Sequence, residues 1–315
     1  MFNVALPWKK LSLRLIQGLR NTGLFNNDWD TVYGITLFVS CSLPEPYRSA
    51  FPLDSAEGRA RAERLTGPEA GGVFSKAQRL VGRLARSSAS AKTESAPEAV
   101  WNSVPEDRMA LCEQVKELLG YPGNPPSSLL ASLFDEVYHG GPLYREMYGV
   151  EPRYNTGVGF IERDKVIVRR SDLGSLAAAS HGRLAMLTGR PRKAAEYSLG
   201  RLISYFKLGA SVFIGDGDVR PTPEAASFRK PSGKSLLWAR EKLHSRRLVY
   251  VGDSAEDLQM VKNARKSADG LAFAGVYANS YEPSEQLRFF RREGAELILP
   301  SVREMPRVMR EVARG

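Results

Sequence analysis

The chain has 315 residues, of which 43% are hydrophobic and 25% charged, and its formal net charge is +10. These are globular values, so wholesale disorder is excluded, and the length is sufficient for one large domain or two ordinary ones. The basic residues are dispersed rather than clustered, so a nucleic-acid partner is not expected, although a preference for anionic substrates fits the charge.

The cysteines, the histidines and the apolar segments indicate a cytoplasmic protein without a membrane anchor. Cys41 and Cys112 are isolated and form no disulfide framework, which favours a reducing compartment. The longest apolar run, residues 33–43, is far shorter than the roughly 20 residues that a membrane span needs, and the chain start lacks a charged leader. No metal-ligand spacing connects the three histidines, His139, His181 and His244.

The first half of the chain is predicted to be helical. The helical segments are 8–20, 28–42, 106–120 and 127–138. Between them, residues 56–105 are rich in Ala, Gly, Ser, Glu and Arg, which predicts an exposed, partly disordered insertion. Residues 138–168 resemble a loop and short hairpin that lead into the second half.

The second half alternates strands and helices. The predicted strands are 184–188, 211–214, 247–251, 271–277 and 295–299, and the predicted helices are 191–206, 232–243, 254–266, 284–293 and 302–312. This alternation predicts a parallel sheet with helices on both faces, whose ligands bind beyond the carboxyl ends of the strands. We therefore place a domain boundary near residue 150, with a helical region at 1–150 and an α/β core at 151–315.

Two features of this core indicate phosphate binding. Thr188 ends an apolar strand and is followed by Gly189, Arg190 and Pro191 at the start of a helix, where backbone N–H groups favour an anion. Lys230, just before another helix, could neutralise a phosphoryl group. The alternative readings are an ordinary N-cap threonine and a surface lysine.

A pair of carboxylates follows the third predicted strand. Asp253 ends the segment "LVYVGD", and Asp257 lies one helical turn further on. Two carboxylates at a strand end suit a hard cation such as Mg²⁺, which binds through one or two carboxylates together with waters and phosphate. The alternative reading of Asp253 is a capping residue.

Taken together and in this order, Thr188, Lys230, Asp253 and Asp257 resemble the second, third and fourth motifs of the haloacid-dehalogenase (HAD) superfamily of phosphohydrolases. The resemblance covers residues 170–313. The segments "RNTGLFNNDWDTVY", "FDEVYHGGPLYREMYG" and "TGRPRKAAEY" are similar to an uncharacterised archaeal and bacterial branch of HAD subfamily I, in which a helical cap follows the first motif.

The resemblance implies a Rossmannoid core with a helical cap, and a mechanism. A first-motif aspartate at the end of the central strand attacks the phosphorus, and a second aspartate two residues on protonates the leaving oxygen. Thr188, Gly189 and Lys230 would hold the phosphoryl group, and Asp253 and Asp257 would hold Mg²⁺. The implied substrate is a small phosphorylated metabolite.

The first motif itself has no convincing match. Asp28 and Asp30 in "NNDWDT" have the D-x-D spacing, but "TGLFNN" before them is not a buried strand. Asn27, Asp28 and Trp29 fall where the resembling branch has cap residues, so they are candidates for substrate contact. The alternative is that they serve cap folding, with Trp29 in the core and Asp28 as a helix N-cap.

Two further candidates for the first motif are weaker still. Asp216 and Asp218 follow an apolar strand, but they come after Thr188 and would need a rearranged topology. In "MFNVALP" Asn3 and Ala5 stand where the aspartates belong. The nucleophile is therefore unknown.

In the family, the first strand lies between the strands that end at Thr188 and Asp253, so without it two strand edges lack partners. Two explanations remain open: a start codon placed too late, or a degenerate relative that fills the gap with "FNVAL". The first predicts an active Mg²⁺-dependent phosphatase once the segment is restored. The second predicts a catalytically inactive phosphate-binding or interaction protein.

Overall fold

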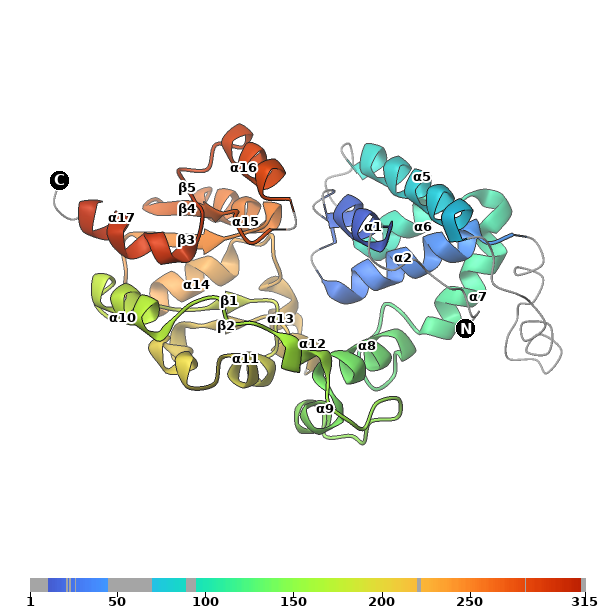
Figure 1. Ribbon diagram of the computed structural model, residues 1–315, viewed down its shortest axis with the longest axis horizontal. Helices are drawn as coiled ribbons and strands as arrows, with labels where there is room; N and C mark the ends of the chain where they lie inside the picture. The colour runs from blue at the N-terminus through green and yellow to red at the C-terminus, as the bar shows by residue number, and fades with distance from the viewer. Residues whose placement is uncertain are drawn as a thin grey trace. The chain divides into compact units, whose positions relative to one another are not determined.

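The structure is a computed structural model, and it describes residues 11–20, 22, 24–25, 27–44, 70–88, 95–219, 222–280 and 282–312. Within these ranges the chain is a mainly helical α/β protein with two small parallel sheets (Figure 1). It divides into two compact units, Met1–Asp135 and Glu136–Gly315, which we call the helical unit and the α/β unit. The mixed α/β class predicted from the sequence is thereby confirmed.

The helical unit is built around one buried helix. Its described elements are α1 (Leu11–Arg20), α2 (Asp28–Ser42), α5 (Ala70–Ser88), α6 (Ala96–Asn102), the 3-10 helix η1 (Glu106–Arg108), α7 (Met109–Leu119) and the start of α8 (Leu129–His139). Helix α2 contacts α1, α5, α6 and α7. Because its sequence is apolar on every side, it is stable only when neighbours surround it, and Tyr33, Leu37 and Phe38 lie in the centre of the core.

The expected disordered insertion at 56–105 is wrong for the part that the structure describes. Residues 70–88 form α5 and residues 96–102 form α6, and both helices pack into the core of the helical unit. The high Arg, Ser and Gly content suggested disorder, but the segment also has an amphipathic helical pattern. Its apolar residues recur at helical spacing and are all buried: Phe74, Ala77, Val81 and Leu84. Residues 56–69 and 89–94 lie outside the described residues.

The α/β unit begins within α8 and contains all the strands that the structure describes. Its helices are α9 (Gly141–Tyr148), α10 (Arg170–Ala179), α11 (Arg192–Leu199), α12 (Asp216–Val219), α13 (Pro223–Ser227), α14 (Lys234–Lys242), α15 (Ala255–Arg265), α16 (Pro283–Arg292) and α17 (Met305–Val312). Its 3-10 helices are η2 (Phe160–Arg163), η3 (Gly200–Tyr205), η4 (Leu208–Ala210) and η5 (Val302–Glu304). Its strands are β1 (Leu187–Thr188), β2 (Val212–Phe213), β3 (Leu248–Gly252), β4 (Leu271–Val276) and β5 (Leu297–Leu299).

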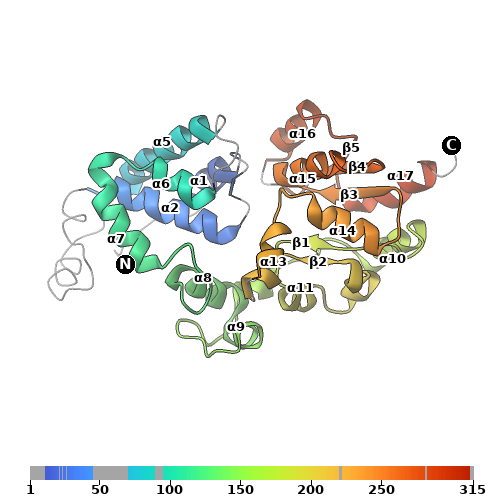
Figure 2. The ribbon, with the colours of Figure 1, turned by 180° about the vertical axis from the view of Figure 1, so that it is seen from behind.

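These strands form two separate parallel sheets, β1–β2 and β3–β4–β5. Alternate residues of β4 point to opposite faces of the larger sheet. Phe273 packs against residues of α14, α15 and α16, whereas Ala274 packs against residues of α10 and α17. Figure 1 views the side of α10 and α17, and Figure 2 views the side of α14 and α15. The strands are thus parallel, and β3–β4–β5 has helices on both faces, but two small sheets stand in place of the one sheet that was predicted.

Two predicted boundaries need correction. The expected loop and hairpin at 138–168 instead contain helix α9 and only one antiparallel bridge, between Gly140 and Val158. The unit boundary lies at Asp135–Glu136 rather than near residue 150. The reason is packing, because Leu143 and Met147 of α9 are buried in one cluster with Ala194 of the α/β unit.

Among the described helices, none combines the length and the apolar character that crossing a bilayer requires.

Candidate functional site

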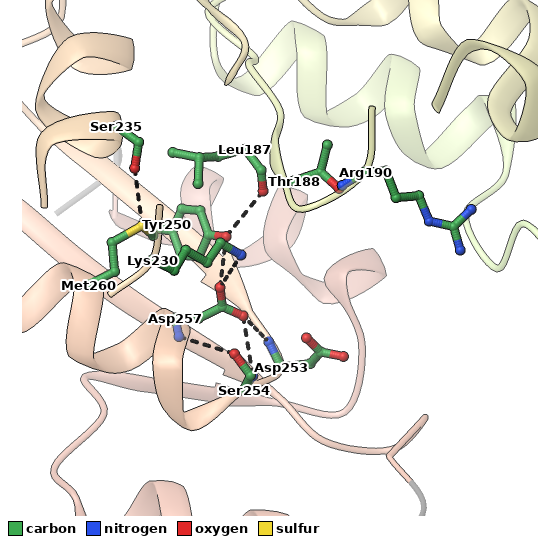
Figure 3. Close-up of polar contacts among 10 residues, drawn as sticks. All are labelled: Leu187, Thr188, Arg190, Lys230, Ser235, Tyr250, Asp253, Ser254, Asp257 and Met260. Carbon is green, nitrogen blue, oxygen red and sulfur yellow. Dashed lines mark hydrogen bonds and ion pairs between the residues drawn. The ribbon is translucent and has the colours of Figure 1, made fainter. Parts of the chain in front are cut away.

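The polar residues that follow β3 and precede α14 meet at the carboxyl end of β3 (Figure 3). Lys230 donates a hydrogen bond from Nζ to Asp257 Oδ1 at 2.7 Å, and the two side chains are only 15% and 4% exposed. The sequence placed Lys230 just before a helix and Asp257 one turn beyond a strand end, but it did not predict that they pair. This buried ion pair holds the ammonium group of Lys230 at the carboxyl end of β3.

Asp257 accepts four hydrogen bonds. Oδ1 accepts from Lys230 and, at 2.9 Å, from the hydroxyl of Tyr250, while Oδ2 accepts from the backbone N–H groups of Asp253 and Ser254 at 3.1 and 3.2 Å. Ser254 returns the contact by accepting the N–H of Asp257, which completes a capping box at the start of α15. Two carboxylate oxygens offer about four lone pairs, so these bonds use the acceptor capacity of Asp257.

This arrangement separates the two carboxylates that the sequence paired as metal ligands. Asp257 faces inward toward Lys230 and the backbone, whereas Asp253 is exposed at the end of β3. Among the residues described, no group of three or more His, Cys, Asp or Glu side chains has the geometry of a metal site. Asp253 is therefore the better candidate for a direct ligand, and Asp257 positions Lys230.

Tyr250 is a member of the site that the sequence analysis missed. Its hydroxyl lies within hydrogen-bond distance of Asp257 Oδ1 and, at 3.3 Å, of the carbonyl oxygen of Leu187 in β1. Burial raises the pKa of Tyr250 well above its usual value, and the nearby charge of Asp257 raises it further, so the phenol stays protonated and acts as a donor. The available signal was a single hydroxyl in the otherwise apolar strand "LVYVG".

The edge of β3 that faces away from β4 has no strand partner among the residues described. Leu248 donates its N–H to Gly270 O at 2.9 Å, so Leu248 and alternate residues face β4. The backbone groups of Val249 and Val251 consequently point to the other edge. Val249 is 41% exposed, which is unusual for a strand of a parallel sheet.

The edge of β1 is open in the same way. Val212 of β2 donates to Met186 O at 2.8 Å, so the backbone of Leu187, one residue on, faces away from β2. Its carbonyl oxygen is the one that the hydroxyl of Tyr250 approaches. We call the space between these two edges, crossed by the Tyr250 side chain, the β1/β3 slot.

The turn after β1 uses part of its anion-binding capacity internally. Thr188 Oγ1 accepts the N–H of Arg190 at 3.2 Å, and the N–H of Arg192 donates to Asp216 Oδ1 at 2.7 Å. The Thr188 hydroxyl hydrogen and the Gly189 N–H are the donors that remain for a ligand. Asp216 is thus engaged by a backbone N–H at the start of α11, and the side chain of Asp218 lies outside the described residues.

The "NNDWD" residues serve the helical unit. Asn27, not Asp28 as expected, is the N-cap of α2, because its Oδ1 accepts the N–H of Trp29 at 2.7 Å. Asp28 forms an exposed ion pair with Arg20 at 2.8 Å. The indole of Trp29 is buried, as expected for a core residue, and its Nε1 donates to Asp135 Oδ1 at 2.8 Å.

Asp30 is likewise committed to the helical unit. Its Oδ1 accepts a hydrogen bond of 2.6 Å from the hydroxyl of the buried Tyr121. The D-x-D spacing of Asp28 and Asp30 therefore arises from one exposed and one inward-facing residue of the first turn of α2. Neither follows a strand that the structure describes, so the geometry gives no support to their role as nucleophile.

A second polar cluster lies beside the turn after β1. Asp164 Oδ2 accepts hydrogen bonds from Arg190 Nη1 at 2.6 Å and from the Tyr138 hydroxyl at 3.0 Å. Burial works against the ionised form of Asp164, but these donors and the Arg190 charge outweigh it and lower its pKa. Burial, together with the positive charge of Arg190, lowers the pKa of the neighbouring His139 to about 4.

The stability of the α/β unit is expected to fall in acid because of His139. Its pKa is 6.5 in the unfolded chain and about 4 when folded, so between these values only the unfolded state takes up the proton. The stabilising contribution is complete above pH 6.5 and is lost as the pH falls through 4, with a full effect of about 3 kcal/mol. Urea unfolding of the wild type and His139→Asn at pH 7.5, 5.5 and 4.5 measures it.

The variant should show a flatter pH dependence, and His244→Asn, which changes an exposed histidine, should not. Parallel curves for all three proteins would contradict this role of His139.

No family model matches the chain, and no curated protein matches it. A solved structure that is similar in fold is titled as the X-ray structure of a Northeast Structural Genomics Consortium target. The likeness has a TM-score of 0.58 at 14% identity and covers 96% of this chain and 84% of that one. At this identity it concerns the fold alone.

Proposed function

We propose that the α/β unit is a phosphohydrolase core of the HAD type, which hydrolyses a small phosphorylated metabolite with Mg²⁺ through an aspartyl-phosphate. The observation that carries the proposal is the Lys230–Asp257 ion pair at the carboxyl end of β3, linked through Tyr250 to the strand that ends at Thr188. Both lie where ligands bind in parallel α/β folds.

The residues present fit two parts of this chemistry, binding of the phosphoryl group and binding of Mg²⁺. The Lys230 ammonium and the hydroxyl of Thr188 would hold the phosphoryl oxygens and stabilise the charge that develops on them. Asp257 and Tyr250 keep the lysine in place. Mg²⁺ binds through one or two carboxylates plus waters and phosphate, so the exposed Asp253 fits as its protein ligand, and the ion would supply charge neutralisation.

The nucleophile would come from a strand in the β1/β3 slot. The backbone groups of Leu187 on one side and of Val249 and Val251 on the other are those with which such a strand would pair. An apolar strand ending in D-x-D would place its first carboxylate at the end of the sheet where Lys230 and Asp253 lie. The Tyr250 side chain would have to turn aside to admit it.

A second candidate function is a catalytically inactive phosphate-binding or interaction protein on the same fold. The observation that favours it is that the Tyr250 side chain already joins β3 to β1, with its hydroxyl oxygen 3.3 Å from the carbonyl oxygen of Leu187. A chain that keeps this link would bind phosphate at Thr188 and Lys230 without forming a covalent intermediate.

Supplying the strand in trans distinguishes the two functions. The protein is refolded with a synthetic peptide of five apolar residues followed by D-x-D-G-T, or with the same peptide carrying N-x-N, and hydrolysis of p-nitrophenyl phosphate is followed with Mg²⁺. We expect activity with the aspartate peptide only, and we expect Asp253→Asn to reduce it on the order of 100-fold. Peptide binding without activity, with phosphate still bound, would favour the inactive protein.

A further inference from the structure

Three side-chain contacts hold Arg190 beside the candidate phosphate site. Its Nη1 donates to Asp164 Oδ2 at 2.6 Å and to Ser198 Oγ at 3.0 Å, and the guanidinium lies 5.5 Å from the ring centre of Tyr138. Its backbone N–H is at the same time bound to the hydroxyl oxygen of Thr188. One residue thus connects the turn after β1 with the segment that carries Asp164.

Only one corner of the guanidinium is used in these contacts. Both side-chain hydrogen bonds go to Nη1, and Nε and Nη2 have no partner among the residues that the structure describes. Nε and Nη2 form the side-on edge of an arginine, whose two parallel N–H groups match the two oxygens of a carboxylate or phosphate. The side chain is 40% exposed, so this edge can be reached from solvent.

The surroundings favour an anion at this edge. Asp164 is the acidic group that contacts the guanidinium, and it does so from the opposite corner. The nearby basic residues Arg192 and Lys193 are paired with Glu196 and Glu146. Arg190 is therefore the cation next to Thr188 with a preorganised and unused pair of donors.

We propose that the Nε/Nη2 edge of Arg190 binds a second anionic group of the substrate whose phosphoryl group lies at Thr188 and Lys230. This inference rests on the proposed function and narrows its substrate class to phosphate esters that carry a further oxyanion, a carboxylate or a second phosphate. In Figure 3 the Arg190 side chain extends away from Lys230, so the second anion lies apart from the phosphoryl group to be transferred. Arg190 is a specificity-determining residue in this scheme.

Binding of non-hydrolysable probes to the full chain tests the inference without requiring catalysis. The probes are propylphosphonate, 3-phosphonopropionate and propane-1,3-diphosphonate, which share one phosphonate and differ in the second group, and affinities are measured by calorimetry. We expect at least one of the two probes that carry a second anionic group to bind about tenfold or more tightly than propylphosphonate. Which one does so identifies the second group as carboxylate or phosphate.

The variants separate the role of Arg190 from simple charge. Arg190→Gln should abolish the preference, and Arg190→Lys should lose most of it, because an ammonium group keeps the charge but lacks the paired donors. Arg201→Gln, which removes an exposed arginine elsewhere in the unit, should retain it. Thermal unfolding of each variant verifies that it is folded.

The outcomes also distinguish this inference from the proposed function. Propylphosphonate binding that is lost in Lys230→Met supports the phosphate site by itself. Equal affinity of all three probes in the wild type, or full preference retained in Arg190→Lys, overturns the role of Arg190 alone. Absence of binding by every probe overturns the phosphate site and this inference with it.

Discussion

Replacing Asp257 by alanine is expected to destabilise the α/β unit by about 3–5 kcal/mol, the range measured when one partner of a buried ion pair is removed. The substitution leaves the Lys230 ammonium without its counter-ion in a position that is only 15% exposed. It also removes the acceptor of the Tyr250 hydroxyl and of two backbone N–H groups at the start of α15. Urea denaturation, together with hydrogen exchange of the β4 amides, measures the loss.

The matched control also removes the Lys230 ammonium group, which the first substitution leaves buried without a counter-ion. In the double variant Lys230→Met, Asp257→Ala no ammonium is left buried, so its stability should exceed that of Asp257→Ala alone. Equal stabilities of the single and double variants would mean that Lys230 escapes to solvent and that the ion pair does not hold it at the site.

Gly159→Ala is expected to be strongly destabilising to the first part of the α/β unit, residues 138–168. A Cβ atom at this position would lie against the backbone of Tyr138, His139 and Gly140, closer than real Cβ atoms approach other atoms. Backbone atoms cannot yield as a flexible side chain can, so the end of α8 and the bridge between Gly140 and Val158 would have to separate. We expect a loss of at least about 4 kcal/mol, measured by urea denaturation.

Gly189→Ala is the control for this prediction. An added Cβ at Gly189 meets no atom within 4 Å, so the substitution should change stability by less than about 0.5 kcal/mol or slightly increase it. If both variants are equally stable, the close backbone approach at Gly159 does not exist in solution.

The open edges of the two sheets bear on function as well as on stability. Parallel strands are ordinarily paired on both sides and covered on both faces, and an unpaired edge exposes N–H and C=O groups. In the α/β unit the Tyr250 hydroxyl lies 3.3 Å from the Leu187 carbonyl oxygen, and Val249 is 41% exposed. Among the described residues β1–β2 and β3–β4–β5 are separate sheets, and the expectation that a first strand is missing between them stays a prediction.

Much of the fold could be predicted because its signals are local. Five apolar segments became β1 to β5, with ends that differ from the predicted ones by a few residues. Serine is a residue type that favours helix N-termini, and Ser254 forms a capping box with Asp257 three residues on. Residues 70–88 were mispredicted because composition was weighed above the helical spacing of Val81, Leu84 and their neighbours.

Less of the candidate site could be predicted, because its hydrogen bonds join residues far apart in the sequence. Lys230 and Asp257 were both singled out, but as a phosphate ligand and a metal ligand rather than as an ion pair. Tyr250 had no motif that marked it. Asp30 matched a motif by spacing, and its hydrogen bond to Tyr121, 91 residues away, assigns it to the core of the helical unit instead.

The sequence by itself determined the alternation of strands and helices and the positions of Thr188, Lys230 and Asp253 at or near element ends. These properties depend on the pattern of residues close together in the sequence, which can be recognised without the tertiary structure. Only the tertiary structure decided that Asp257 turns inward to Lys230, that Tyr250 crosses the β1/β3 slot, and that Arg190 keeps one edge unused. Each depends on which distant groups packing brings within about 3 Å, and no local pattern encodes that distance.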